Sequence, residues 1–129
     1  MLYLSKPILD SRLSLRPWST WVPVYSSAAG SLTTVTTNEA RYMAWGNDVL
    51  FMVDCTLNDI GTATADLRIT NLPLAVHHNS TGIGSVAGGA RQILFLGGST
   101  IAVMWTIDNV FPAVNGQRAF WHGQYSYQP

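Results

Sequence analysis

A stretch of alternating apolar residues between residues 41 and 73 constrains the fold more than any other feature of this sequence. In its longest run the alternate positions are occupied by Val49, Phe51, Val53, Cys55 and Leu57. A period of two is typical of a half-buried β-strand and is not compatible with an amphipathic helix. We therefore expect a β-strand over residues 49–57 with one buried face.

The residues on either side of this run predict two further strands. Residues 41–45 are a strand candidate, and Gly46-Asn47-Asp48 joins them to the central run as a turn, because Gly and Asn tolerate positive φ at little cost. A polar loop over residues 58–65 leads to a third strand over residues 66–70, which ends before Pro73 because proline has no N–H for a ladder. We expect the three strands to pair in order, as an antiparallel meander with one buried face.

The order and spacing of these motifs resemble a module of tailed-bacteriophage virion proteins. The residues that carry the resemblance are Tyr42-x-x-x-Gly46-Asn47-x-Val49-x-Phe51, a short Gly-containing loop, and Leu67-Arg68-Ile69-x-x-Leu72-Pro73. In that family the module occurs at tail-fibre tips and in small head-decoration (cement) proteins, as a jelly-roll sandwich that trimerises much as C1q and tumour-necrosis-factor domains do. The resemblance covers residues 20–75, and it implies an architecture and a virion context but no catalytic residues.

The remainder of the chain adds short strands separated by turn signals. Further strand candidates are residues 21–25, 32–37, 83–87, 91–96, 99–107 and 118–127. Frequent turns without a helical pattern are typical of a sandwich or jelly roll. We predict an all-β fold, an antiparallel jelly-roll β-sandwich of about eight strands over residues 20–129 with an extended N-terminal arm over residues 1–19.

The chain carries little charge for a soluble protein of its length. Charged residues make up 11% of the sequence and hydrophobic residues 47%, whereas typical soluble domains contain about 25% charged residues. A small monomer of this composition would expose large apolar patches, which mark association surfaces. A surface rich in Ser, Thr, Asn and Gly is the alternative. We expect an oligomer, by resemblance a homotrimer, with Met104, Trp105 and Phe120 at the subunit interface because the strand at 99–107 is apolar on both faces.

Residues 1–19 form a candidate arm that needs a partner to become ordered. Pro7 and Pro17 exclude a continuous helix, and Leu13 and Leu15 alternate with polar residues as in a strand. The backbone entropy lost on ordering such a segment exceeds what the burial of its aliphatic side chains returns. We therefore expect a docking surface larger than one subunit. The alternative is an ordinary first strand that completes the chain's own sheet.

The resemblance implies that this arm binds the major capsid protein of the same virion and staples neighbouring capsid subunits. The candidate capsid-binding residues are Leu2, Tyr3, Leu4, Lys6, Ile8, Leu9, Arg12, Leu13, Leu15, Arg16 and Trp18. Three basic residues against Asp10 give the arm a charge of +2, which favours acidic capsid patches. Because the chain starts at Met1 with no shaft-forming region before the sandwich, we expect a decoration protein on the capsid surface, assembled in the host cytoplasm, rather than a fibre tip.

The histidines and the single cysteine do not form the pattern of a metal or catalytic site. His77 and His78 are adjacent and lack the spacing of paired metal ligands, while His122 lies far away in the sequence. Cys55 lies on the apolar face of its strand, where a thiol is a small buried hydrophobe and not a nucleophile. We predict no enzymatic activity, no cofactor and no metal site within one chain. A histidine ring around a trimer axis is the alternative that the sequence leaves open.

Nucleic acids, membranes and saccharides are the other partners on which the sequence bears. The net charge is 0 and the basic residues are scattered singly, so we expect no nucleic-acid binding, and no apolar segment is long enough to span a membrane. Aromatic side chains support an alternative function, a tail-fibre or tail-tip module that recognises host surface saccharide. Its candidate binding residues are Trp121, Tyr125 and Tyr127, expected as an exposed cluster. The competing interpretation places most aromatic residues in the core or the subunit interface.

Overall fold

A single antiparallel sheet contains all the strands that the computed structural model describes, in residues 18–105 and 111–128. The strands are β1 Ser19–Thr20, β2 Tyr25–Ser26, β3 Thr34–Trp45, β4 Asp48–Asp59, β5 Asp66–Ile69, β6 Ser80–Val86, β7 Gly89–Phe95, β8 Ala102–Trp105 and β9 Gln117–Ser126. Their order in the sheet is β1-β3-β4-β9-β6-β7-β8-β5-β2. The predicted all-β, antiparallel character of the chain is confirmed.

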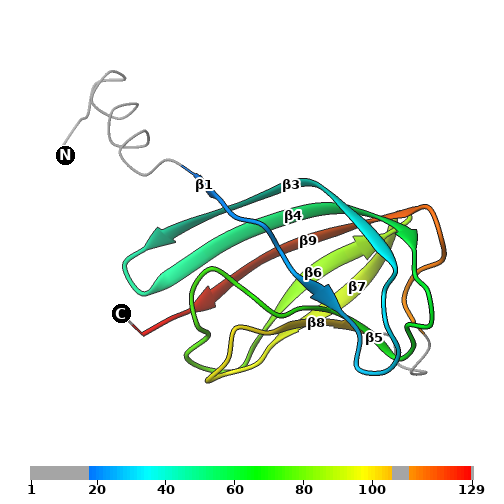
Figure 1. The fold of residues 1–129 in the computed structure, drawn as a ribbon. Coiled ribbons are helices and arrows are strands. Elements are labelled where there is room, and N and C mark those ends of the chain that lie inside the picture. The colour runs from blue at the N-terminus through cyan, green and yellow to red at the C-terminus, as the bar shows by residue number, and fades with distance from the viewer. Residues whose placement is uncertain (1–17, 106–110, 129) are drawn as a thin grey trace, which may run out of the picture.

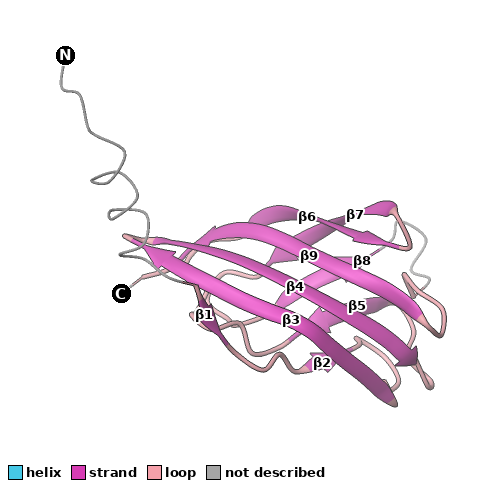
Figure 2. Cartoon of the chain, turned by 90° about the horizontal axis from the view of Figure 1, so that it is seen from above, coloured by secondary structure: helices cyan, strands magenta, loops and turns pink. Residues whose placement is uncertain are grey.

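The sheet curls until its two ends come close, and one short segment joins them. β3, β4 and β9 form one layer, β7, β8 and β5 face it, and β6 links the layers by pairing with both β9 and β7 (Figures 1 and 2). We call residues 19–26 the crossing segment. It begins as β1 on β3 and ends as β2 on β5, and in Figure 1 it runs as the blue trace across the open side between the layers.

β3 and β4 form a long hairpin that supplies much of the core. Each strand has 12 residues, and Gly46 takes a φ of 62° in the turn between them. The alternate residues of β4 from Val49 to Leu57 are at most 3% exposed, so the strand predicted from the period of two is confirmed. The strands expected at 32–37 and 41–45 prove to be one strand, β3. Its register shifts between Thr37 and Glu39, which identifies a β-bulge at Asn38.

The expected meander is wrong beyond this first hairpin. β4 pairs on its other side with β9, from Asp48↔Ser126 to Leu57↔Gln117, so both of its edges are occupied. Residues 60–65 instead carry the chain to the opposite layer, where β5 pairs with β8 and β2. The alternating pattern of each segment predicts that it is a strand but not which strands lie beside it. The neighbour of β4 is β9, which comes from the far end of the chain.

Two expected strands are shorter in the structure than in the sequence analysis. Instead of one strand over residues 21–25, the crossing segment has two short strands with Pro23 buried between them. Asn71 holds this part of the segment, because its side-chain amide donates to Val22 O (2.8 Å) and its Oδ1 accepts from Val24 N (2.6 Å). The strand expected at 99–107 begins only at Ala102, because residues 97–100 form a turn and bend, and its expected end at 106–107 lies outside the described residues.

Glycines in β6 and β9 let the two layers approach closely. The rings of Phe51, Phe95 and Tyr125 pack together with centroids 5.3–6.2 Å apart. A Cβ added at Gly123 would lie 2.5 Å from the Phe95 ring. One added at Gly84 would lie 2.5 Å from Met104 Cε and 2.7 Å from a backbone oxygen. The core is therefore dense because β6 and β9 present hydrogen atoms where other strands present side chains.

Gly84→Ala should lower the free energy of unfolding by about 1–3 kcal/mol, since the added methyl group overpacks the core against backbone that cannot move. Gly89→Ala is the matched control, because its nearest neighbour is the flexible end of Arg91 at 3.1 Å; we expect a change within about 0.5 kcal/mol. Urea unfolding followed by tryptophan fluorescence measures both. Equal midpoints for the two variants would contradict the proposed packing.

Candidate functional site: the open edge of β3

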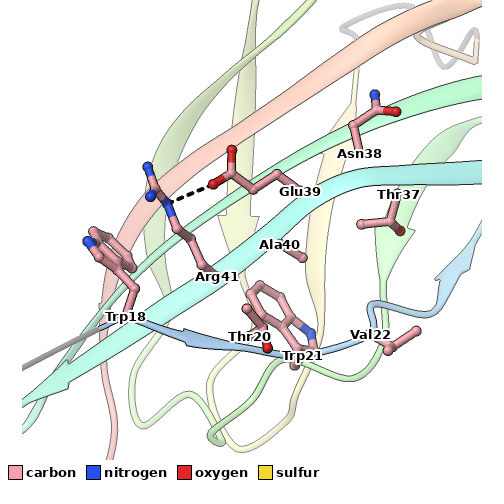
Figure 3. Close-up of a pocket in the computed structure, with 9 residues that line it drawn as sticks. All are labelled: Trp18, Thr20, Trp21, Val22, Thr37, Asn38, Glu39, Ala40 and Arg41. Atoms are coloured by element: carbon pink, nitrogen blue, oxygen red, sulfur yellow. Dashed lines mark ion pairs between the residues drawn. The ribbon is translucent and has the colours of Figure 1, made fainter.

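An open groove runs along the edge of β3 where the crossing segment turns away from it (Figure 3). It has a volume of about 690 Å³. Its lining residues are Trp18, Thr20, Trp21, Val22, Thr37, Asn38, Glu39, Ala40 and Arg41. One wall is the beginning of the crossing segment and the other is β3 itself. We call this feature the edge groove.

The edge groove exists because β1 covers only a small part of β3. β1 pairs with Tyr42 and Arg41 alone, and the chain then departs toward β5. Residues 34–40 of β3 pair with β4 on one side, and on the other side the described residues provide no paired strand. In an antiparallel strand, alternate residues direct their backbone N–H and C=O groups to opposite sides. Part of the backbone of residues 34–40 is thus directed to the groove and is available to another strand.

Charged and aromatic side chains form the outer rim of the groove. Arg41 Nε lies 3.3 Å from Glu39 Oε1, and its guanidinium group lies over the Trp18 ring at 5.0 Å from the centroid. The same Nε donates to Met52 Sδ at 3.0 Å. A cation–π contact of this kind fixes the Trp18 ring against β3. Because the Glu39 side chain is 48% exposed, its ion pair contributes little to stability but places a carboxylate at the rim.

The inner wall of the groove is apolar and is anchored in the core by Trp21. The Trp21 ring packs edge-on against Tyr42 at 5.8 Å and Phe51 at 6.3 Å. Its Nε1 is buried without a hydrogen-bond partner among the described residues. Next to it, Val22 is 80% exposed and Val24 is 54% exposed. The groove therefore has two chemically different sides, a charged rim on the outer face of the sheet and an apolar wall on the inner side (Figure 3).

A polar cluster behind the rim fixes the bulge in β3. Asp54 is buried on the outer face of β4, and Arg118 of β9 donates to both of its carboxylate oxygens. Asn38, the bulge residue, donates from Nδ2 to Asp54 Oδ1 at 3.2 Å and to Thr56 Oγ1 at 3.0 Å. The hydrogen bonds and charge of Asp54 raise the pKa of Arg118. This cluster ties β3 to β4 and β9, so the edge of the sheet is held in a defined shape.

The interior behind the groove contains the single thiol. Burial raises the pKa of Cys55 from 9.0 to about 11, and it also raises the pKa of Tyr25, whose hydroxyl lies 2.8 Å from Thr37 Oγ1. Cys55 is fully buried, as its alternation with Phe51 and Val53 predicted. A protonated, inaccessible thiol is not a nucleophile, so this interior serves packing and not covalent chemistry.

The three residues predicted at the subunit interface differ in their exposure to solvent. Met104 is fully buried inside the subunit, so its assignment to a subunit interface was wrong. It lies on the inward face of β8, opposite the buried Leu67 and Ile93, and its Cε lies close to Gly84. Trp105 is 45% exposed and Phe120 is partly buried, so both remain at the surface. Of the predicted capsid-binding residues only Trp18 is described, and it is 41% exposed. The others, from Leu2 to Arg16, lie outside the described residues.

The expected exposed aromatic cluster on β9 is not present. Trp121 is 0% exposed and Tyr125 is 1% exposed, and the Tyr125 hydroxyl donates to Leu74 O at 2.8 Å. Both belong to the inward face of β9, while Phe120 lies on the other face and Tyr127 follows the strand, partly buried. The sequence could not distinguish the faces, because aromatic residues occur on both. The assignment of Trp121 and Tyr125 to saccharide binding is therefore wrong.

The histidines gather in no metal centre within the described part of the chain. His77 and His78 are exposed, with ring centroids 3.8 Å apart, and His122 lies exposed on β9. In residues 18–105 and 111–128, no group of three or more His, Cys, Asp or Glu side chains is placed to hold a metal ion. The same ranges contain no helix long and apolar enough to cross a membrane.

Comparisons of this chain with known protein families, with curated proteins and with solved structures find no match. The candidate site therefore depends on the geometry of its own residues. Sequence reasoning missed Trp21, Asn38, Glu39 and Arg41 as site residues. The one signal that could have indicated them is Pro23, which prevents the first strand from continuing along β3.

Raising the pH above 9 should destabilise the protein through Cys55. The thiol ionises near pH 9.0 when unfolded but only near pH 11 when folded, so its contribution is present below pH 9 and is lost as the pH rises through 11. The loss attributable to this group is roughly 2–3 kcal/mol. Urea unfolding at a series of pH values should show a shallower decline for Cys55→Ala, although that variant starts less stable at pH 8. Parallel profiles for the two proteins would show that the thiol does not contribute.

Proposed function

We propose that this protein is a structural virion protein, a homotrimeric capsid decoration (cement) protein that staples neighbouring capsid subunits through its N-terminal arm. The observation that chiefly supports the proposal is the exposed apolar surface of residues 18–24, which follow residues 1–17 in the sequence. Trp18, Val22 and Val24 are 41%, 80% and 54% exposed. Such a surface, continuous with an apolar arm, favours a partner larger than one subunit.

The distribution of charge supports an oligomer. Three of the four arginines in the described ranges form ion pairs within the subunit, Arg41–Glu39, Arg68–Asp66 and Arg118–Asp54. Within these ranges little unpaired charge is left to keep a monomer soluble, while Ile83 and Val114 are also more than half exposed. A trimer that buries part of this apolar surface explains the composition. Trp105 and Phe120 are the surface residues that we assign to the subunit interface.

The finer architecture is part of the proposal. The motif residues that resemble the phage module form the β3–β4 hairpin and β5, which lie in opposite layers of the curled sheet. A chain that moves from one layer to the other between consecutive strands is compatible with a jelly-roll sandwich. We propose that the body is a jelly roll of the trimeric phage type and that residues before β1 act as its arm.

The proposed mechanism is multivalent docking. Three arms on one trimer bind neighbouring copies of the major capsid protein, and their linkage raises the effective concentration of each arm at its site. The aliphatic side chains of the arm supply the holding energy, while Lys6, Arg12 and Arg16 orient it toward acidic capsid patches. The protein then sits on the outer surface of the capsid. The saccharide-binding alternative is weaker, because of its three proposed residues only Tyr127 is not fully buried.

Replacing apolar arm residues should abolish binding to capsids. We expect Leu4→Asp with Ile8→Asp to weaken binding at least about a hundredfold, because two buried aliphatic side chains are lost. The matched control is Ser5→Asp with Ser11→Asp, which adds the same charge to the same arm and should weaken binding much less. Co-sedimentation with particles that lack this protein, from the virion whose genome encodes it, measures both. Undiminished binding by the first variant would refute the staple.

A further inference from the structure

The open edge of β3 has the backbone and the composition that pairing with a further strand requires. Residues 34–40 include Val35 and three threonines, which favour extended backbone, and they contain no proline. Residues 37–40 of this edge line the edge groove, whose opposite wall stands away from β3 where the crossing segment departs. A further strand beside these residues would pair with backbone groups that now have no paired strand beside them in the described part of the chain.

The register of β1 directs the described start of the chain away from this edge. β1 runs antiparallel to β3, with Ser19 opposite Tyr42 and Thr20 opposite Arg41. Continued toward the N-terminus, the same register leads to Met43 and then to Trp45 at the hairpin turn. This direction is away from residues 34–40. We therefore assign a strand on the open edge to another chain.

We propose that residues 12–16 of a second copy of this chain pair with the open edge of β3. The segment reads Arg-Leu-Ser-Leu-Arg, an alternating pattern with two leucines on one face and two arginines and a serine on the other. It lies directly before Pro17, outside the described residues. Its length suits the seven residues of β3 that remain uncovered, 34–40.

The two faces of this strand match the two sides of the groove. The arginine face meets the outer rim, where the Glu39 carboxylate is 48% exposed. The leucine face meets the apolar wall formed by Trp21 and Val22. The net charges of the two parts are also opposite in sign, because the first sixteen residues carry +2 and the rest of the chain −2. The half-exposed Glu39 carboxylate, shared with Arg41, accepts the arginines and the inner wall buries the leucines, so the strand is accepted in one orientation of its faces.

This exchange explains how copies associate. Each copy gives its strand to the next, which is a heterologous contact, and three such contacts close a ring if the rotation is 120°. Residues 1–11, with Lys6, remain available for the capsid, and the exchange reassigns Arg12 and Arg16 from the capsid to the neighbouring copy. The inference rests on the proposed oligomer but not on its location in a virion, so it is tested on the purified full-length protein alone.

The first experiment breaks the proposed strand in the full-length chain. Ser14→Pro removes an N–H and stiffens the backbone in the middle of the segment, and Ser5→Pro makes the same change outside it. Light scattering at micromolar concentration should give three times the 14.1 kDa subunit mass for the wild type and for Ser5→Pro. Ser14→Pro should be monomeric, with an unchanged far-UV circular dichroism spectrum. A trimeric Ser14→Pro variant would overturn the exchange.

The second experiment tests the rim by exchanging charges. Glu39→Arg should weaken association by up to about fivefold per contact, since each exposed pair contributes at most about 1 kcal/mol. Combining it with Arg12→Glu and Arg16→Glu should restore the wild-type association constant. Arg12→Glu with Arg16→Glu alone is the control and should weaken association. Failure of the combined variant to recover would overturn the assignment of these partners.

The outcomes separate this inference from the proposed function. A wild-type trimer that persists in Ser14→Pro overturns the strand exchange, while the capsid-binding test of the arm is unaffected. A monomeric wild-type protein overturns both the exchange and the proposed trimer. Loss of the trimer in Ser14→Pro together with charge-swap rescue supports the exchange, whatever the capsid assay shows.

Discussion

The pairing of one short segment with both ends of a curled sheet is the constraint on which this structure depends. The crossing segment reaches from β3 to β5, with Trp21 packed into the core at one end and the Asn71 amide holding its backbone at the other. Without it, β6 would be the one described strand that pairs with both layers. The same segment also creates the edge groove, because it leaves β3 after two paired residues in order to reach β5. Closure of the fold and exposure of the β3 edge therefore have one cause.

The alternation of apolar and polar residues predicted the strands well. It could not predict which strands pair when they are far apart in the sequence. The alternate residues of β4 from Val49 to Leu57 are buried because apolar side chains occur at every second position and so lie on one face of the strand. The placement of β5 in the opposite layer does not follow from such a pattern, because it depends on β9 having already occupied the second edge of β4. The error on β9 has a similar origin. Trp121 and Phe120 are both aromatic and adjacent, so only the identity of the facing layer decides which one is buried.

The candidate site was less predictable than the fold, because it is made by backbone that lacks a neighbour. No single residue type identifies an open strand edge, and Glu39 and Arg41 have the appearance of ordinary surface charges in the sequence. Asn38 gains its role only through the bulge, which brings its amide to Asp54 on the next strand. Such features can be recognised only once the order of the strands in the sheet is known, and that order came from the structure.

The chemistry of the open edge determines what it can accept. Natural sheets protect exposed edges with charges and bulges, and residues 34–40 carry one of each, Glu39 and the bulge at Asn38. These devices oppose pairing with an arbitrary apolar strand, because the half-exposed Glu39 carboxylate would lose water without gaining a partner besides Arg41. They do not oppose a strand that brings guanidinium groups to one face and aliphatic side chains to the other. Protection against unwanted strands and selection of a basic, amphipathic one are thus the same physical property of this edge.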